Sequence, residues 1–334
     1  MSLKNLNSPP LVAIAGAGIA VGLPMLEAAL SSSASLTLLK SLNAAAFATN
    51  VIAVSLPGRL DGPQDDEMRS GNLNPKKPND ATSSAKKEDT FLVDKGESSS
   101  SSSAGYMLNR SRTLVNPSGW AFAIWGPIYL GEAAFVTAQF LASDAAASTL
   151  LPQITAPFVA ANIFQSLWCA SFRPSYGEGW KKYVSAGMLA GTACSLSLVH
   201  SAGSAVADGS TLSHLLLPLT MHFGWITAAT LVNLNGSLAS DESASPRSLI
   251  ALGHSSALAA TALGVGLTLS WSAPTYGLTL AWALAACADG MTKRIPAQSP
   301  VEEETLAKAG TVQKNLCWTG SFACAVAAAY AGLF

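Results

Sequence analysis

Long apolar runs with almost no charge are the feature of this sequence that most restricts its fold. A membrane-spanning helix needs about 20 mostly apolar residues, and most of the chain falls into runs of roughly that length. Hydrophobic residues make up 49% of the 334 residues and charged residues only 12%, about half of the charged share of a soluble globular domain. The sequence therefore predicts an all-α, polytopic membrane helix bundle.

Nine segments are apolar enough to be candidate spans. The first contains Pro24 and Glu27, so it is either a span or a signal-anchor. The second contains Lys40, Asn43 and Asn50 and is not expected to face lipid on all sides. The candidates lie at about 10–30, 35–56, 119–142, 153–172, 182–203, 212–236, 249–270, 274–290 and 314–334.

The segment 57–112 differs in composition from the rest of the chain. It is rich in Pro, Gly, Ser and charged residues, and residues 57–114 hold 18 of the 39 charged side chains. Such a composition buries too little apolar surface to offset the conformational entropy lost on ordering. We therefore expect a disordered loop at 57–112.

Basic residues are distributed unevenly over the predicted connections. When the long loop is left out, one side of the nine-span arrangement receives nine Lys and Arg residues and the other receives Lys40 alone. The positive-inside rule then places the N-terminus and the 57–112 loop on the cytoplasmic or equivalent side, in a membrane that the sequence does not identify. The net charge of −1 gives no electrostatic argument for a nucleic-acid partner. The nine basic residues are Lys4, Arg173, Lys181, Lys182, Arg247, Lys293, Arg294, Lys308 and Lys314.

A carboxylate near the middle of the span at 119–142 is the first candidate functional residue. At 100° per residue, Glu132 shares one helical face with Trp125 and Tyr129. An ionisable residue at membrane depth costs about 2.5–3.5 kcal/mol on insertion scales and nearly always faces the bundle interior. Glu132 then either hydrogen-bonds a neighbouring helix for packing alone, or it serves a ligand cavity or proton path.

A second stripe of polar, aromatic and small residues lies in the span at 212–236. Pro218, His222, Trp225, Ala229 and Asn233 recur at intervals of four, three, four and four residues, which places them on one helical face. Such a mixture suits a cavity with a mostly apolar wall and a few polar groups, although plain helix packing explains it as well.

Several segments, taken in order, resemble the TspO/translocator-protein family, also called the tryptophan-rich sensory proteins. NPSGWAFAIWGPIY, from Asn116, is similar to the start of the family's second helix, and WITAATLVN, from Trp225, is similar to its fifth-helix motif. NIFQSLWCASF, which contains Trp168, resembles the third-helix stretch, and GEGW places Trp180 at the start of the fourth helix. The Phe122-to-Trp125 spacing is one residue shorter than in the best-known members and resembles that of a divergent branch, and Met221-His222 stands where the best-known members have Pro-Tyr.

The resemblance implies a domain division and a ligand. It implies a five-helix core at 35–238, interrupted by the loop, with an N-terminal apolar helix at 1–34 and three additional membrane helices at 239–334. Family members bind porphyrins, haem-like tetrapyrroles or sterol-like ligands within the five-helix bundle. The ligand-binding residues predicted from the stripes and the resemblance together are Trp125, Tyr129, Glu132, Trp168, Trp180, His222, Trp225, Ala229 and Asn233.

The expected function is binding, with translocation as a further possibility, of a flat hydrophobic ligand in an intramembrane aromatic pocket. The partners are the lipid bilayer and that ligand, and a homodimer is left open. Proton-coupled transport of a small solute and a structural bundle without ligand are the alternatives. The sequence shows neither a nucleophile–base pair nor a metal-ligand cluster, so we expect no catalytic residue, metal site or required cofactor. Porphyrin degradation follows from the resemblance alone, and haem or porphyrin enters as a ligand.

The residue His222 has three interpretations. Its imidazole, one turn before Trp225, can ligate haem iron, hydrogen-bond a tetrapyrrole, or bond Glu132 or a backbone carbonyl for packing alone.

Overall fold

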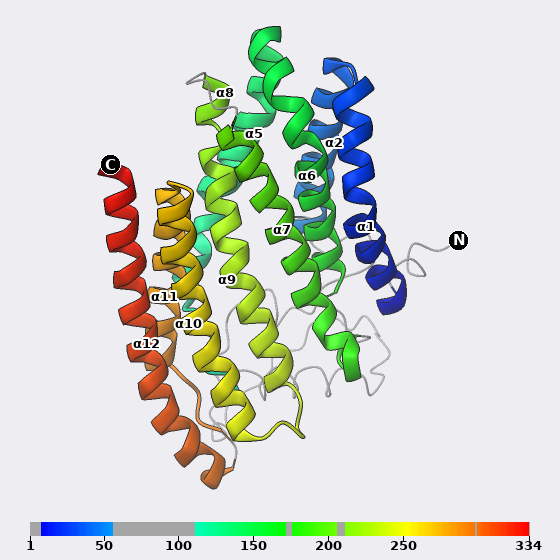
Figure 1. The fold of residues 1–334 in the computed structure, drawn as a ribbon. Helices are drawn as coiled ribbons and strands as arrows, with labels where there is room; N and C mark the ends of the chain where they lie inside the picture. Colours follow the sequence, from blue (N-terminus) through cyan, green and yellow to red (C-terminus); the bar gives the residue numbers. More distant parts are fainter. Residues whose placement is uncertain (1–7, 56–110, 172–175, 206–210, 298, 334) are drawn as a thin grey trace, which may run out of the picture.

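The computed structural model describes residues 8–55, 111–171, 176–205, 211–297 and 299–333. Within these ranges the chain forms nine helices of 17 residues or more, which run roughly side by side (Figure 1). A short helix, α8 (Thr211–His214), and two 3₁₀ turns, η2 (Gly119–Ile124) and η4 (Gly179–Tyr183), connect them. The long helices are α1 (Pro9–Ser33), α2 (Leu36–Ser55), α5 (Trp125–Leu141), α6 (Asp144–Ala170), α7 (Val184–Ala205), α9 (Leu217–Ala239), α10 (Pro246–Ser270), α11 (Pro274–Thr292) and α12 (Pro300–Leu333).

The helices alternate in direction, so α1 begins and α12 ends at opposite ends of the bundle (Figure 1). In the described part of the chain, six helical segments are long and apolar enough to cross a membrane. The helices α6, α9 and α11 are not among them, because they carry buried polar residues such as Asn162, Asn235 and Thr279. The expected helical membrane bundle is confirmed. The six segments are Pro9–Ser33, Leu36–Val54, Gly119–Leu141, Gly179–Ala205, Pro246–Ser270 and Pro300–Leu333.

Serine caps and prolines determine where several of these helices begin. The side chains of Ser8, Ser143 and Ser245 each accept a hydrogen bond from a backbone N–H in the first turn of the following helix. Proline follows Ser8 and Ser245 directly, at a position where its missing N–H costs nothing. These signals fix where α1, α6 and α10 begin.

The helix α9 lies between two groups of helices. One side of α9 packs against α5 and α7, and the other packs against α10 and α11. The helices α2 and α6 complete the first group, and α12 packs on α10 and α11 in the second. The helix α1, expected as a span or signal-anchor, packs on α6 and α7 and buries Val12 and Leu23. One continuous apolar cluster connects the whole bundle.

The segment before α5 crosses the lower end of the bundle and packs on α11. The backbone N–H of Ser118 donates to the carbonyl of Ala286 at 3.0 Å. The chain approaches so closely that a Cβ on Gly290 would overlap the carbonyl oxygen of Asn116. The indole of Trp282 donates to the carbonyl of Ala121 at 3.1 Å. The residues that open the family motif are therefore held by α11.

A buried arginine fixes the start of this segment and corrects the predicted loop boundary. Residues 57–110 of the expected loop lie outside the described residues, but Arg112 is only 4% exposed. Its guanidinium bonds Glu302 at 2.7 Å and three backbone carbonyls between α9 and α10. Composition alone assigned Arg112 to the loop, because the partners that satisfy its charge are 127 to 190 residues away.

The last helix begins earlier than the apolar pattern indicates. The helix α12 starts at Pro300 rather than near residue 314. Its first turn carries Glu302 and Glu303, and carboxylates stabilise the positive end of a helix dipole. The apolar run therefore misses the first turns of the helix, although Leu306 and Gln313 there are fully buried.

Candidate ligand-binding site

A buried acid–base pair joins α5 to α9. The Nδ1 atom of His222 lies 2.6 Å from Oε1 of Glu132, and the two residues are 2% and 1% exposed. The helices approach closely here because Gly131 leaves room for the ring of Pro218, which a Cβ at this position would overlap. The two stripes expected from the sequence thus face each other, and the prediction that Glu132 faces inward is confirmed.

Aromatic rings pack around this pair on the side where α5 begins. The ring of Trp125 stacks on that of Tyr129, with 5.3 Å between centroids and 25° between planes. The rings of His222 and Trp225 lie edge-on to Trp125, at 5.5 and 6.1 Å. Phe122 adds a further edge-on contact to Trp225 at 5.7 Å. Edge-on and offset contacts are the arrangements that the ring quadrupole favours, so this cluster forms a wall of aromatic faces and edges.

A third helix, α6, and a fourth, α2, complete the cluster. The side-chain amide of Gln165 donates to the hydroxyl of Tyr129 at 3.0 Å. The ring of Phe47, on α2, lies 6.4 Å from that of Tyr129. Gln165 belongs to the stretch NIFQSLWCASF that resembles the family's third helix.

The remaining predicted residues occupy two different places. The indole of Trp168 donates to Oδ1 of Asn233 at 3.3 Å, and the amide of Asn233 donates to the carbonyl of Ala229 at 2.9 Å. Ala229 and Asn233 lie farther along α9 than His222 and Trp225, and Trp168 reaches Asn233 from α6. Trp180 is 56% exposed in η4, at the lower end of α7, and among the described residues it makes no ring contact with the cluster. The structure therefore brings eight of the nine predicted residues to α5, α6 and α9, and leaves Trp180 outside.

Several buried polar atoms in the cluster have no hydrogen-bond partner in the described part of the chain. They are Oε2 of Glu132, Nε2 of His222, Nε1 of Trp225 and Oε1 of Gln165. More than nine in ten buried polar groups in native proteins are satisfied. Four unpartnered atoms within one aromatic cluster are a signal of a ligand or of bound water.

Polar side chains that the sequence did not place in the site extend the polar interior above Glu132. Asn43 of α2 donates to Gln139 at 3.0 Å and to Thr155 at 3.1 Å. About two turns farther along α2, and therefore lower in the bundle, Asn50 donates to Asn162 at 3.1 Å. The sequence predicted from Lys40, Asn43 and Asn50 that this helix does not face lipid on all sides, but it named no partner.

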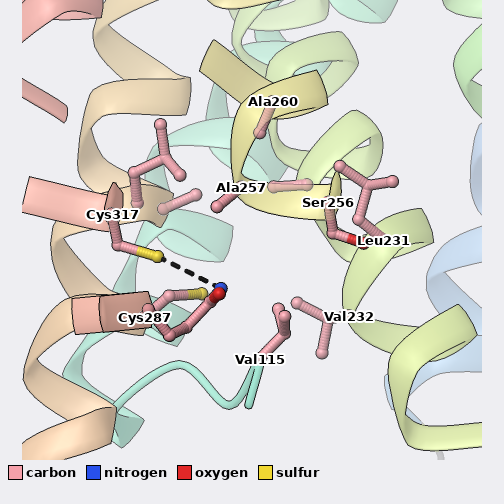
Figure 2. A pocket seen from close by; sticks show the side chains of 12 residues that line it. Val115, Leu231, Val232, Ser256, Ala257, Ala260, Cys287 and Cys317 are labelled. Carbon is pink, nitrogen blue, oxygen red and sulfur yellow. Dashed lines mark hydrogen bonds between the residues drawn. The ribbon is translucent and has the colours of Figure 1, made fainter. Parts of the chain in front are cut away.

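A cavity lies on the opposite side of α9 (Figure 2). It is a small pocket, partly open to the outside, and its walls are mostly small apolar side chains of α9 to α12. Its polar groups are already paired, because Ser256 accepts from Asn235 at 2.7 Å and Gln313 donates to the carbonyl of Gly253 at 3.1 Å. None of the nine predicted site residues lines it. This cavity therefore offers space without free polar groups, whereas the aromatic cluster offers free polar groups without open space.

The cluster differs from a metal centre in composition. Within the described ranges, no group of three or more His, Cys, Asp or Glu side chains lies close enough to hold a metal ion. The groups that the cluster supplies are one acid–base pair, two unpartnered ring nitrogens and four large aromatic faces, which suit the binding of a flat ligand.

Fold and site together define a polytopic helical membrane protein with a buried aromatic–polar cluster between antiparallel helices. The family model described as TSPO-like protein matches residues 95–299, which is more than half of the chain. The chain belongs to the TSPO-like family. The comparisons found no matching curated protein and no matching solved structure.

The match covers α5 to α11 and the segment that precedes α5. It begins after α2 and includes α10 and α11, whereas the resemblance placed a five-helix core at 35–238. The division into an N-terminal helix, a core and a C-terminal extension stays a prediction. All of the predicted site residues fall within the matched range.

Proposed function

We propose that the protein binds a flat hydrophobic ligand, a tetrapyrrole or a sterol-like molecule, in the aromatic cluster between α5, α6 and α9. The observation that carries this proposal is the set of unpartnered buried atoms on Glu132, His222, Trp225 and Gln165 among aromatic rings. Large aromatic faces match a flat apolar body, and a few polar groups fix its orientation. In this structure the rings are in contact, so the ligand enters between rings that move apart.

The experiment is a titration of the purified full chain in detergent with protoporphyrin, haem and a sterol. Binding to the cluster quenches the fluorescence of Trp125 and Trp225 and shifts the Soret absorbance of the porphyrins. We expect saturation at one ligand per chain. A linear, unsaturable response that equals the response of detergent alone would contradict the proposal.

A second candidate function is proton-coupled transport of a small solute, favoured by one observation. Glu132 and His222 form an acid–base pair inside the bundle, and the buried amides of Gln139 and Asn43 lie between this level and the upper end. Buried ionisable residues in membrane proteins commonly mark proton relays. Acidification of proteoliposomes during solute uptake, lost in Glu132→Gln, would favour this function over ligand binding.

A further inference from the structure

Two fully buried side-chain amides, on α2 and α5, form an incomplete pair. The Nδ2 atom of Asn43 donates to Oε1 of Gln139 at 3.0 Å and to Oγ1 of Thr155, on α6, at 3.1 Å. Within the described residues, Oδ1 of Asn43 and Nε2 of Gln139 are buried without a hydrogen-bond partner. One acceptor and one donor are therefore left over in the bundle interior, on residues that are not among the nine predicted for the aromatic cluster.

The left-over donor and acceptor do not depend on how the two amides are oriented. The oxygen and nitrogen of a side-chain amide are assigned from their hydrogen bonds. If both amides are turned over, Gln139 donates to the oxygen of Asn43, and the hydroxyl of Thr155 can donate to that oxygen as well. The nitrogen of Asn43 and the oxygen of Gln139 are then left over instead. In either orientation the pair lacks one partner that donates and one that accepts.

These two free groups select the chemical class of the missing partner. A metal cation would face the free N–H, and an anion would face the free carbonyl oxygen, so neither suits the pair. The partner is therefore a neutral molecule that carries both a donor and an acceptor. Asn43, Gln139 and Thr155 are all 0% exposed, so the molecule is enclosed by protein and must be small.

We infer that α2, α5 and α6 enclose a bound water molecule, which donates to the free oxygen of the amide pair and accepts from its free N–H. Water is the smallest neutral molecule that does both, and buried waters make two to four hydrogen bonds to polar groups that are otherwise unsatisfied. The polar face continues about two turns farther along α2, where Oδ1 of Asn50 is buried and has no donor in the described part of the chain. The helix α2 thus presents a hydrated face to the interior of the bundle, separate from the aromatic cluster.

Solid-state NMR on the full chain in proteoliposomes tests this water site. Water-edited spectra transfer magnetisation from water protons to the isotope-labelled side-chain amides that water contacts. We expect rapid transfer to Nε2 of Gln139, a signal assigned by its loss in Gln139→Leu, although this side chain is fully buried. Absence of transfer in the folded parent overturns the inference, and so does transfer from lipid protons alone.

Three variants connect the water to the amide pair. Asn43→Leu removes the oxygen to which the water donates, so the water loses one of its two partners and we expect the transfer to Gln139 to be lost. Thr155→Val leaves both free atoms in place and should retain the transfer. Asn235→Leu, at a buried amide on α9, is the matched control and should also retain it. Retention of the transfer in folded Asn43→Leu, or an equal loss in Asn235→Leu, overturns the bridging water. The measurement on the parent decides whether the water is present even where Asn43→Leu does not fold.

Discussion

Glu132 of α5 and His222 of α9 are 90 residues apart in the sequence, and their side chains share a buried hydrogen bond of 2.6 Å. This bond is where the two polar–aromatic stripes of the sequence meet. His222 also marks the departure of this chain from the best-known members of its family, which have Pro-Tyr where this chain has Met221-His222. The contact therefore joins the two stripes at a position where the resemblance marks a departure.

Breaking the Glu132–His222 pair should lower the stability of the fold. Glu132→Gln keeps an oxygen that accepts from Nδ1, whereas Glu132→Leu leaves Nδ1 buried without a partner. We expect Leu to cost roughly 1–3 kcal/mol, the usual penalty for an unsatisfied buried polar group, and Gln to cost clearly less. Thermal unfolding in detergent measures both variants. Equal losses in the two would show that packing, and not the hydrogen bond, determines the role of Glu132.

The wall of the proposed site can be tested at Trp225. Trp225→Ala removes a ring that contacts both Trp125 and Phe122, and we expect porphyrin affinity to fall about three- to tenfold, in the range of one aromatic contact. Trp318→Ala, at a position 49% exposed on α12, should leave affinity unchanged. Fluorescence titration gives both values, with size-exclusion chromatography as the check that each variant is folded. An unchanged affinity in folded Trp225→Ala would remove this residue from the site.

The contact of the segment before α5 with α11 predicts different effects of Gly→Ala at two helical positions. A Cβ at Gly290 would overlap the backbone of Asn116, whereas a Cβ at Gly266 on α10 meets only open space. We expect Gly290→Ala to destabilise by roughly 1–3 kcal/mol, as overpacking does, and Gly266→Ala to be neutral or slightly stabilising. Thermal melting of both variants is the measurement. If the two variants have the same melting temperature, the segment before α5 does not approach α11 as closely as the structure shows.

The turn between α9 and α10 predicts a pH-dependent contribution to stability. Hydrogen bonds from Lys182 and Ser243 lower the pKa of Asp241 from its ordinary value to about 2. A lowered pKa means that this contribution is present above about pH 4 and is lost as the pH falls toward 2. The residue is partly exposed, so the effect is small.

Asp241→Asn should have a slightly lower melting temperature than the parent at pH 6, and the two melting temperatures should converge on acidification. Glu304→Gln, at an exposed pair with Lys308, is the control. A difference that is the same at pH 6 and pH 3 would contradict this account.

The alternation of the helices predicts the sidedness of two sites in the chain. A tag near Ser100, in the segment outside the described residues, and a tag after Phe334 should lie on opposite sides of the membrane. The reason is that α5 begins and α12 ends at opposite ends of the bundle (Figure 1), and the basic residues favour one end. Protease protection in sealed vesicles reports each tag. Equal protection of both would contradict the nine-span topology.

The sequence by itself determined the class of the protein and the faces of its helices. Lack of charge required a membrane bundle, and the 3.6-residue period placed Glu132 with Trp125 and His222 with Trp225. These conclusions could be drawn because each depends on residues close together in one helix. Lys40, Asn43 and Asn50 predicted in the same way that the second span does not face lipid on all sides.

Only the tertiary structure decided which faces meet. Helical period defines the faces of a single helix but leaves open how each helix is rotated against its neighbours, since side-chain fit over long separations determines that rotation. The structure thus turned Glu132 to His222, left Trp180 outside the cluster, and placed the NPSGW segment on α11 rather than among the helices of the site. It also buried Arg112, which the composition of the surrounding segment had assigned to a loop. Carbonyls and a carboxylate more than a hundred residues away satisfy its charge.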